Sequence, residues 1–117
     1  LELVGDGQQT RCFTHGSDIA NGIIAVAISE NGEHQDFNVA SPEETKMLEL
    51  AEKIWKICGR KEAFQVKHVP GFTYDIKRRV PDTTKIQTLL GWKPQVAFDD
   101  GLREVVTWLQ KEMEKKQ

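Results

Sequence analysis

The apolar residues of the first third of the chain recur at the spacing of one helical face. Between residues 18 and 29 these positions are Ile19, Ile23, Val26 and Ala27. The spacing predicts a helix that ends near Glu30, where Asn31-Gly32 signals a turn. We expect Ser17 to cap this helix and the carboxylate of Asp18 to lie in its first turn, at the positive end of the helix dipole.

Two further helices are predicted from the same spacing. The inward-facing positions are Met47, Leu50, Ala51, Ile54 and Ile57 in the first, and Leu102, Val105, Val106, Leu109 and Met113 in the second. The first has two possible starts, because Ser41-Pro42-Glu43-Glu44 fits a capping box and Thr45 offers a later one. Gly59 closes it as a left-handed cap. The second is expected over residues 99–115.

Short extended segments are predicted between the helices. Leu1–Val4 has the pattern of the end of a strand, and Gly5-Asp6-Gly7 supplies the left-handed backbone for a turn. An extended piece then carries Arg11–Phe13. Further strands are expected at Asp36–Val39 and Phe64–Val69.

The remaining segment is a loop over residues 72–81, followed by a short helix that Thr83 or Thr84 starts and Gly91 ends. Trp92 is expected to pack against the last helix. Strands and helices therefore alternate, which predicts an α/β fold with about four helices and three or four short strands. At 117 residues the chain has the size of a single domain, residues 1–117.

The composition excludes several classes of protein. Hydrophobic residues make up 38% of the chain and charged residues 29%, the balance of a globular rather than a disordered protein. The longest apolar stretch, Ile19–Ile28, is about half of what a bilayer requires, so no membrane partner is expected. The net charge of −2 gives no reason to expect nucleic acid, and any anion site must be local.

Cysteine and histidine residues give no metal-site pattern. Cys12 and Cys58 lie far apart, and two buried free thiols are favoured over a disulfide. Free thiols and the lack of a visible signal peptide favour the cytoplasm. The three histidines, His15, His34 and His68, share no spacing typical of metal ligands, and we expect structural or surface roles for them.

Arg11 is the strongest candidate for a functional side chain. It follows the glycine-rich turn and the polar residues Gln9 and Thr10, which can orient its guanidinium towards phosphate oxygens. Three consecutive basic residues, Lys77-Arg78-Arg79, could form a second part of a diphosphate clamp. In both cases the alternative is an ordinary solvent-exposed charge, and spacing alone favours that alternative.

Three motifs together resemble one protein family. They are Gly5–Asp18, Arg79-Val80-Pro81-Asp82 and Leu89-Leu90-Gly91-Trp92-Lys93-Pro94. They are similar to the second half of the extended short-chain dehydrogenases/reductases, the NAD-dependent epimerases, dehydratases and decarboxylases of nucleotide sugars. The resemblance implies that the chain is the C-terminal, substrate-binding part of such an enzyme, with α+β character when it stands alone. It also favours the helix start near Thr45.

The resemblance implies which residues bind the substrate, a nucleoside-diphosphate sugar. Arg11 matches the arginine of a G-x-G-x-Q-x-R motif that contacts the diphosphate, and Arg79 matches the arginine of R-x-P-D. Asp75 is placed where the family has a ribose-binding aspartate, since a carboxylate accepts two hydroxyl protons. Gln9 and Arg78 complete the expected set.

Several positions depart from the family pattern. Phe72 stands where many members have a phosphate-binding arginine, so Arg11 and the basic cluster would carry that task. Ala97 replaces a usual serine cap of the last helix.

The chemistry of the family is missing from these residues. They contain no G-x-x-G-x-x-G motif for a dinucleotide. The catalytic Tyr-x-x-x-Lys is also absent, since Tyr74 is followed four residues later by Arg78. The resemblance therefore implies that NAD is bound by an absent N-terminal Rossmann half and that the chain alone is inactive.

Two expectations remain open at this stage. If the chain is part of such an enzyme, the apolar face of helix 18–29 is exposed and a homodimer could cover it, while UDP should bind in the millimolar range. The alternative is a stand-alone, non-catalytic module that binds phosphorylated ligands or a protein partner.

Overall fold

The fold was examined in a computed structural model, which describes residues 1–116. Its elements are β1 (Glu2–Val4), β2 (Thr10–Cys12), α1 (Gly16–Ile28), the 3-10 turn η1 (Glu30–Gly32), β3 (Glu44–Lys46), α2 (Met47–Ile57), β4 (Lys67–Val69), α3 (Thr84–Leu90) and α4 (Phe98–Glu114). The predicted α/β class and the expected number of helices and strands are confirmed.

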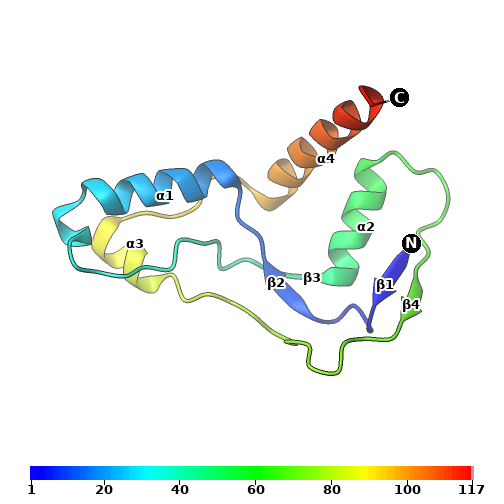
Figure 1. The fold of residues 1–117 in the computed structure, drawn as a ribbon, viewed down its shortest axis with the longest axis horizontal. Coiled ribbons are helices and arrows are strands. Elements are labelled where there is room, and N and C mark those ends of the chain that lie inside the picture. The colour runs from blue at the N-terminus through cyan, green and yellow to red at the C-terminus, as the bar shows by residue number, and fades with distance from the viewer. Residues whose placement is uncertain (117) are drawn as a thin grey trace.

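The strands form two small sheets rather than one. β1 pairs with β4 in parallel, and β2 pairs with β3 in antiparallel register, with Arg11 opposite Thr45 and Cys12 opposite Glu44. Figure 1 shows β2 and β3 in the middle of the molecule, between α1 with α3 on one side and α2, β1 and β4 on the other. The β2–β3 pair therefore joins two arms of the chain.

A glycine turn connects β1 to β2, as predicted. Gly5 and Gly7 both have left-handed backbones, with φ of 71° and 72°. A side chain at Gly7 would stand 2.5 Å from the Leu3 side chain and 3.0 Å from that of Leu48. The carbonyls of Gly7 and Gln9 accept hydrogen bonds of 3.0 Å from the Leu48 and Met47 amides. The turn therefore satisfies the first amides of α2.

This arrangement decides between the two predicted starts of α2. The helix begins at Met47, after a Lys46 cap position that makes no side-chain hydrogen bond. The capping box at Ser41 is wrong, because Glu44–Lys46 instead pair with β2 as β3. The later start, near Thr45, is close to the observed one.

The N-terminus of α1 also differs from the prediction. The cap is His15, whose Nδ1 accepts a 3.3 Å hydrogen bond from the Ser17 amide. Ser17 already lies inside the helix, so the predicted Ser17 cap is wrong. Asp18 is in the first turn as expected, but it is only 2% exposed and accepts the amides of Gln95 and Val96 at 3.0 and 2.9 Å. Its carboxylate therefore fixes the segment that leads into α4.

Two predicted strands are corrected. The segment Asp36–Val39 forms no strand, because no strand within residues 1–116 pairs with it. The side-chain amide of Asn38 instead donates to the Asp82 carbonyl at 2.9 Å. Phe64–Val69 is reduced to β4, the portion that lies beside β1. Phe64 packs edge-on against Trp55.

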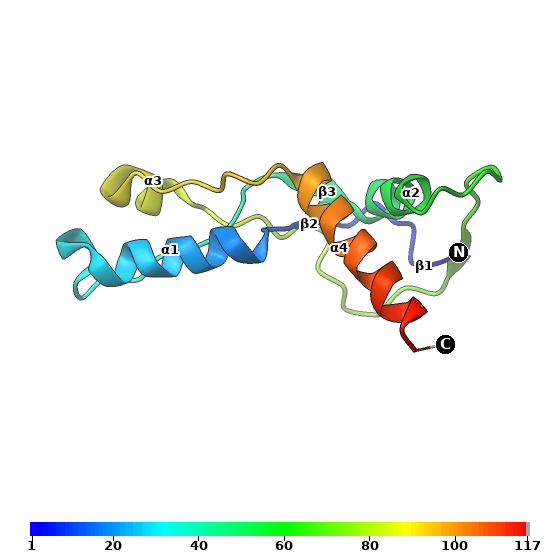
Figure 2. The same ribbon diagram turned by 90° about the horizontal axis from the view of Figure 1, so that it is seen from above.

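The packed core is small for a chain of this length. Its buried apolar residues are Leu3, Ala51, Ile86 and Val106. The radius of gyration is 17.4 Å, whereas a compact domain of this size has about 13 Å. Figure 2 shows how thin the molecule is when seen from above, in keeping with extents of 52 × 38 × 21 Å. Large parts of the helices are therefore covered on one side only.

Helix α4 illustrates this incomplete packing. In α4, Val105, Leu109 and Met113 are 45%, 46% and 65% exposed, so these predicted inward positions are only partly covered, although Val105 faces α2 across an apolar cavity. Trp92 lies against Gly22 of α1, a neighbour that the sequence did not predict.

Candidate functional site

The candidate site is built on the two faces of β2. Alternation along a strand puts Thr10 and Cys12 on one face and Arg11 on the other. The edge of β2 that faces away from β3 lies beside the loop of residues 72–81. The backbone amide of Thr10 donates to the Lys77 carbonyl at 2.9 Å, and Thr10 pairs with Arg78 in a single parallel bridge. The loop thus pairs with the free edge of β2 at a single point.

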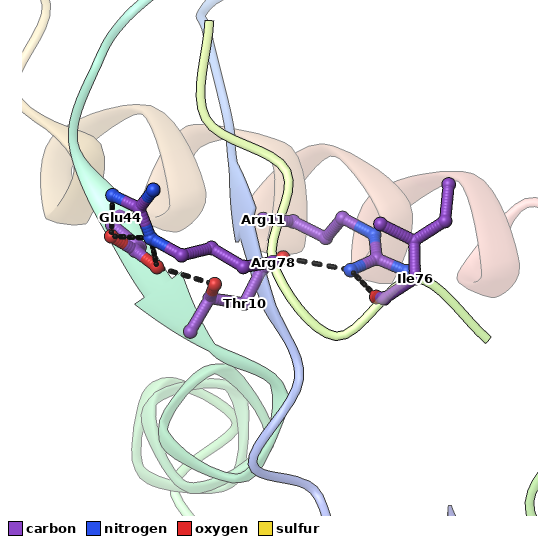
Figure 3. A network of polar contacts seen from close by, with 5 residues as sticks. All are labelled: Thr10, Arg11, Glu44, Ile76 and Arg78. Atoms are coloured by element: carbon purple, nitrogen blue, oxygen red, sulfur yellow. Dashed lines mark hydrogen bonds and ion pairs between the residues drawn. The ribbon is translucent and has the colours of Figure 1, made fainter.

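Arg11 is held by the loop on its own face of β2. Its Nη1 donates to the carbonyls of Thr10 and Ile76, both at 2.7 Å, and its Nη2 donates to Asp75 Oδ1 at 3.1 Å. Figure 3 shows the guanidinium turned towards Ile76. A guanidinium has five N–H donors. These three bonds leave one donor on Nη2 and one on Nε for an external oxygen anion.

Arg78 occupies the opposite face, where it is bonded to Glu44. Its Nε lies 3.0 Å from Glu44 Oε1 and its Nη2 lies 3.0 Å from Oε2, a bidentate geometry. The Thr10 hydroxyl donates to the same carboxylate at 2.5 Å. Figure 3 shows Glu44, Thr10 and Arg78 on the side of β2 away from the Arg11 guanidinium. Arg11 and Arg78, which were expected to bind one substrate, therefore lie on opposite faces of β2.

The remaining predicted residues flank this arrangement. Arg79 is exposed and directly follows Arg78 in the sequence. The side-chain amide of Gln9 donates to the Val4 carbonyl at 3.1 Å and so stabilises the glycine turn. It is not among the hydrogen-bond partners of the Arg11 guanidinium. The structure thus brings Arg11 and Asp75 together and separates Arg78 from them.

The charge of Glu44 is stabilised by its partners. The hydrogen bond from Thr10, followed by the one from Arg78, lowers the pKa of Glu44 below its ordinary value. Cys12 lies opposite Glu44 in the β2–β3 pair, and burial together with the Glu44 charge raises the pKa of its thiol. Both cysteines are free, and the predicted burial is only partial.

Sequence reasoning missed Glu44 as part of the site and named Thr10 only as a residue that orients Arg11. Glu44 fitted the capping-box pattern, which assigned it to the start of a helix. The β-branched Thr10 next to Arg11 could have indicated a strand here, since such residues favour strands. The sequence does not indicate its partner strand, because Thr10 and Glu44 are 34 positions apart.

An apolar cavity of about 350 Å³ lies elsewhere, between α2, α4 and the start of α1. Its lining includes Phe13, Leu50, Ile54, Phe98 and Leu102. Phe13 and Phe98 are stacked with ring centroids 5.6 Å apart. The named arginines do not line this cavity, so it is unsuited to a diphosphate.

Other classes of site were tested on the same structure. Within residues 1–116, no cluster of three or more His, Cys, Asp or Glu side chains could hold a metal ion. No helix in the described part of the chain is long and apolar enough to cross a membrane. The described residues also do not fit NAD, because the glycine turn leads into β2 and not into a helix whose N-terminus could receive a pyrophosphate.

Comparison with solved structures defines the class of fold. Over 97% of the chain, the structure matches the UDP-glucose 4-epimerase of Thermotoga maritima, solved with UDP-glucose, with a TM-score of 0.86 and 25% identity. It matches the dTDP-glucose 4,6-dehydratase of Bacillus anthracis, solved with NAD, over 97% of the chain with a TM-score of 0.85 and 27% identity. In each case the chain corresponds to 35% of the solved chain. The fold is that of an extended short-chain dehydrogenase/reductase.

The sequence comparison gives the family. The model for GDP-mannose 4,6 dehydratase matches residues 1–105, and the chain belongs to this family. UDP-glucuronic acid decarboxylase 1 of Danio rerio is 32% identical over 114 residues, which are 97% of this chain and 26% of that protein. The chain thus spans about a quarter of the length of this curated relative. The predicted resemblance is confirmed, and the family is one of enzymes.

Proposed function

We propose that the chain is the nucleotide-sugar-binding, C-terminal part of an NAD-dependent nucleotide-sugar epimerase, dehydratase or decarboxylase. The observation that carries the proposal is the Arg11 guanidinium, which three hydrogen bonds orient, two of them to the loop and one to Thr10 of β2, while two of its donors stay available. A guanidinium that is held in place and still has available N–H donors is well suited to binding phosphate oxygens. Family membership supports the choice of a nucleoside diphosphate as the anion.

Each residue of the proposed site has a distinct task. Arg11 and Arg79 neutralise the diphosphate from one face of the β2–loop pair. Asp75 uses one carboxylate oxygen to hold Arg11, and its second oxygen accepts ribose hydroxyl protons. Gln9 keeps the glycine turn next to β2 through its bond to Val4. Arg78 acts through the loop and not as a direct ligand.

The redox chemistry is assigned to residues outside this chain. NAD and the catalytic tyrosine and lysine belong to another part of the intact enzyme, and these 117 residues are inactive on their own. The intact enzyme oxidises the sugar at C4 and then epimerises, eliminates or decarboxylates it. The free thiols Cys12 and Cys58 suit a reducing compartment such as the cytoplasm.

Nucleotide titration tests the proposal directly. UDP, dTDP, GDP and CDP are titrated into the protein by calorimetry, and at least one should bind with a Kd on the order of 1 mM. Arg11→Ala should weaken that binding about 10- to 150-fold, because it removes a charge-assisted contact worth about 1.5–3 kcal/mol. Arg103→Ala, a change in α4, is the matched control and should bind like the wild type. Equal affinity of wild type and Arg11→Ala would remove Arg11 from the site.

We also propose a homodimer formed through α1. Ile23, Ile24 and Ile28 on this helix are 58%, 54% and 79% exposed, although they belong to an otherwise apolar stretch. Burying such side chains is favourable by about 1.5–3 kcal/mol each, and a second copy offers the same apolar surface.

A further inference from the structure

The loop that carries Asp75 and Arg79 is attached to β2 by a second set of contacts, on the face away from Arg11. Glu44 of β3 binds the Arg78 guanidinium through both carboxylate oxygens and also accepts the Thr10 hydroxyl. Three segments, β2, β3 and the loop, therefore meet at one carboxylate. We call Glu44, Thr10 and Arg78 the carboxylate clasp.

The clasp coincides with the point that sets the register of the loop. Thr10 pairs with Arg78, and its amide donates to the Lys77 carbonyl at 2.9 Å. A shift by one residue reverses which face each side chain occupies. It would also move Asp75 and the Ile76 carbonyl away from Arg11, which both now contact. The geometry around Arg11 therefore depends on the residue that faces Glu44.

Charge alone does not decide how the loop pairs with β2, because it contains three consecutive basic residues, Lys77, Arg78 and Arg79. Any of them could approach a carboxylate. A bidentate pair requires the planar fork of an arginine, which disfavours Lys77. The backbone bond from Thr10 to Lys77 and the hydroxyl bond from Thr10 to Glu44 then select Arg78 over Arg79. With Arg78 held on the Glu44 face, an extended backbone would direct the next residue, Arg79, to the Arg11 face.

We propose that Glu44 is a positioning residue of the anion site. Through the clasp it fixes the register of the loop, so that Asp75 orients Arg11 and Arg79 is available on the same face. Glu44 itself does not touch the nucleotide, and a carboxylate on that face would repel a diphosphate. The inference rests on the proposed nucleotide binding.

The test uses two readouts, one of which needs no ligand. Amide hydrogen exchange of Thr10, followed by NMR, reports whether β2 and the loop stay paired. UDP titration reports the anion site. Glu44→Ala should lower the protection of the Thr10 amide and the UDP affinity, each by about tenfold. The charge-exchanged variant Glu44→Arg/Arg78→Glu keeps a bidentate pair and should restore both to within about twofold of wild type.

A matched ion pair serves as the control. Glu2 and Lys67 also link two strands, with Nζ 3.3 Å from Oε1 on exposed side chains. The exchange Glu2→Lys/Lys67→Glu and the single change Glu2→Ala should leave both readouts unchanged. A similar loss in Glu2→Ala would show a general structural effect and overturn the positioning role.

The outcomes separate this inference from the proposed function. If Arg11→Ala weakens UDP binding but Glu44→Ala changes neither readout, the nucleotide site stands and the role of Glu44 is overturned. If Glu44→Ala lowers Thr10 protection but the wild-type protein binds none of the four nucleotides, the proposed function fails and the role of Glu44 in an anion site fails with it. Failure of the charge-exchanged variant to restore either readout also overturns the proposal.

Discussion

Arg11 and Asp75 are 64 positions apart in the sequence, yet Nη2 of the arginine lies 3.1 Å from Oδ1 of the aspartate. Their side chains are 28% and 33% exposed. Partly solvated pairs of this kind contribute little to folding, about 0–1 kcal/mol. The pair is therefore better explained by what it orients than by the stability that it adds.

This relationship predicts a separation of binding from stability. Asp75→Asn should leave the free energy of unfolding within about 0.5 kcal/mol of wild type and should weaken UDP binding about tenfold, because Arg11 loses a charged partner and the ribose loses an acceptor. Urea denaturation and calorimetry measure the two quantities. Asp36→Asn is the matched control, since Asp36 pairs with Lys85 at the surface. Unchanged UDP affinity in Asp75→Asn would contradict the assigned role.

The lowered pKa of Glu44 predicts a pH dependence of the clasp. Because the folded-state pKa is lowered, the stabilisation is fully present above the unfolded value of about 4.3 and is lost as the pH falls through the folded value. An NMR titration of the Glu44 carboxyl carbon measures this pKa. Thr10→Val and Arg78→Ala should each raise it, because each removes a hydrogen bond that lowers the pKa of this carboxylate. No change in Thr10→Val would mean that the hydroxyl does not donate to this carboxylate.

The elements that the sequence predicts well are those with local signals. The ends of α2 and α3 follow from Gly59 and Gly91, which both have left-handed backbones in the structure. The cap of α1 was misplaced because His15, an uncommon capping residue, supplies the acceptor that Ser17 was expected to supply. In each case the decisive atoms lie within a few residues of the helix end.

The features that the sequence does not predict depend on distant contacts. β3 has no alternating pattern of its own, and Glu44–Lys46 become a strand only because β2 lies beside them. Asp36–Val39 has the right composition but no strand next to it. Family resemblance selected Arg11 and Asp75 separately, whereas their direct bond and the separation of Arg78 from Arg11 follow from the register of the loop.

The packing of Trp92 predicts a steric test within α1. A side-chain carbon at Gly22 would lie 3.0 Å from Cε2 of Trp92 and still closer to Val39. Gly22→Ala should therefore destabilise the fold by about 1–3 kcal/mol, through overpacking that outweighs the gain in helix propensity. Gly16→Ala is the control, because nothing lies within 4 Å of the added carbon. Thermal unfolding followed by circular dichroism compares the two, and equal stabilities would contradict this placement of Trp92.

The exposed face of α1 predicts concentration-dependent self-association. Ile24 is 54% exposed, so Ile24→Glu removes apolar contact area from the surface without disturbing the core, and surface changes of this kind usually alter stability by about 0.5 kcal/mol or less. Sedimentation equilibrium should show a dimer for the wild type and a monomer for Ile24→Glu, because a buried glutamate pair would repel across the interface. Met113→Glu, at a 65% exposed position of α4, should stay dimeric. A wild-type protein that is monomeric at all concentrations would rule out the dimer, and dissociation by Met113→Glu alone would move the interface to α4.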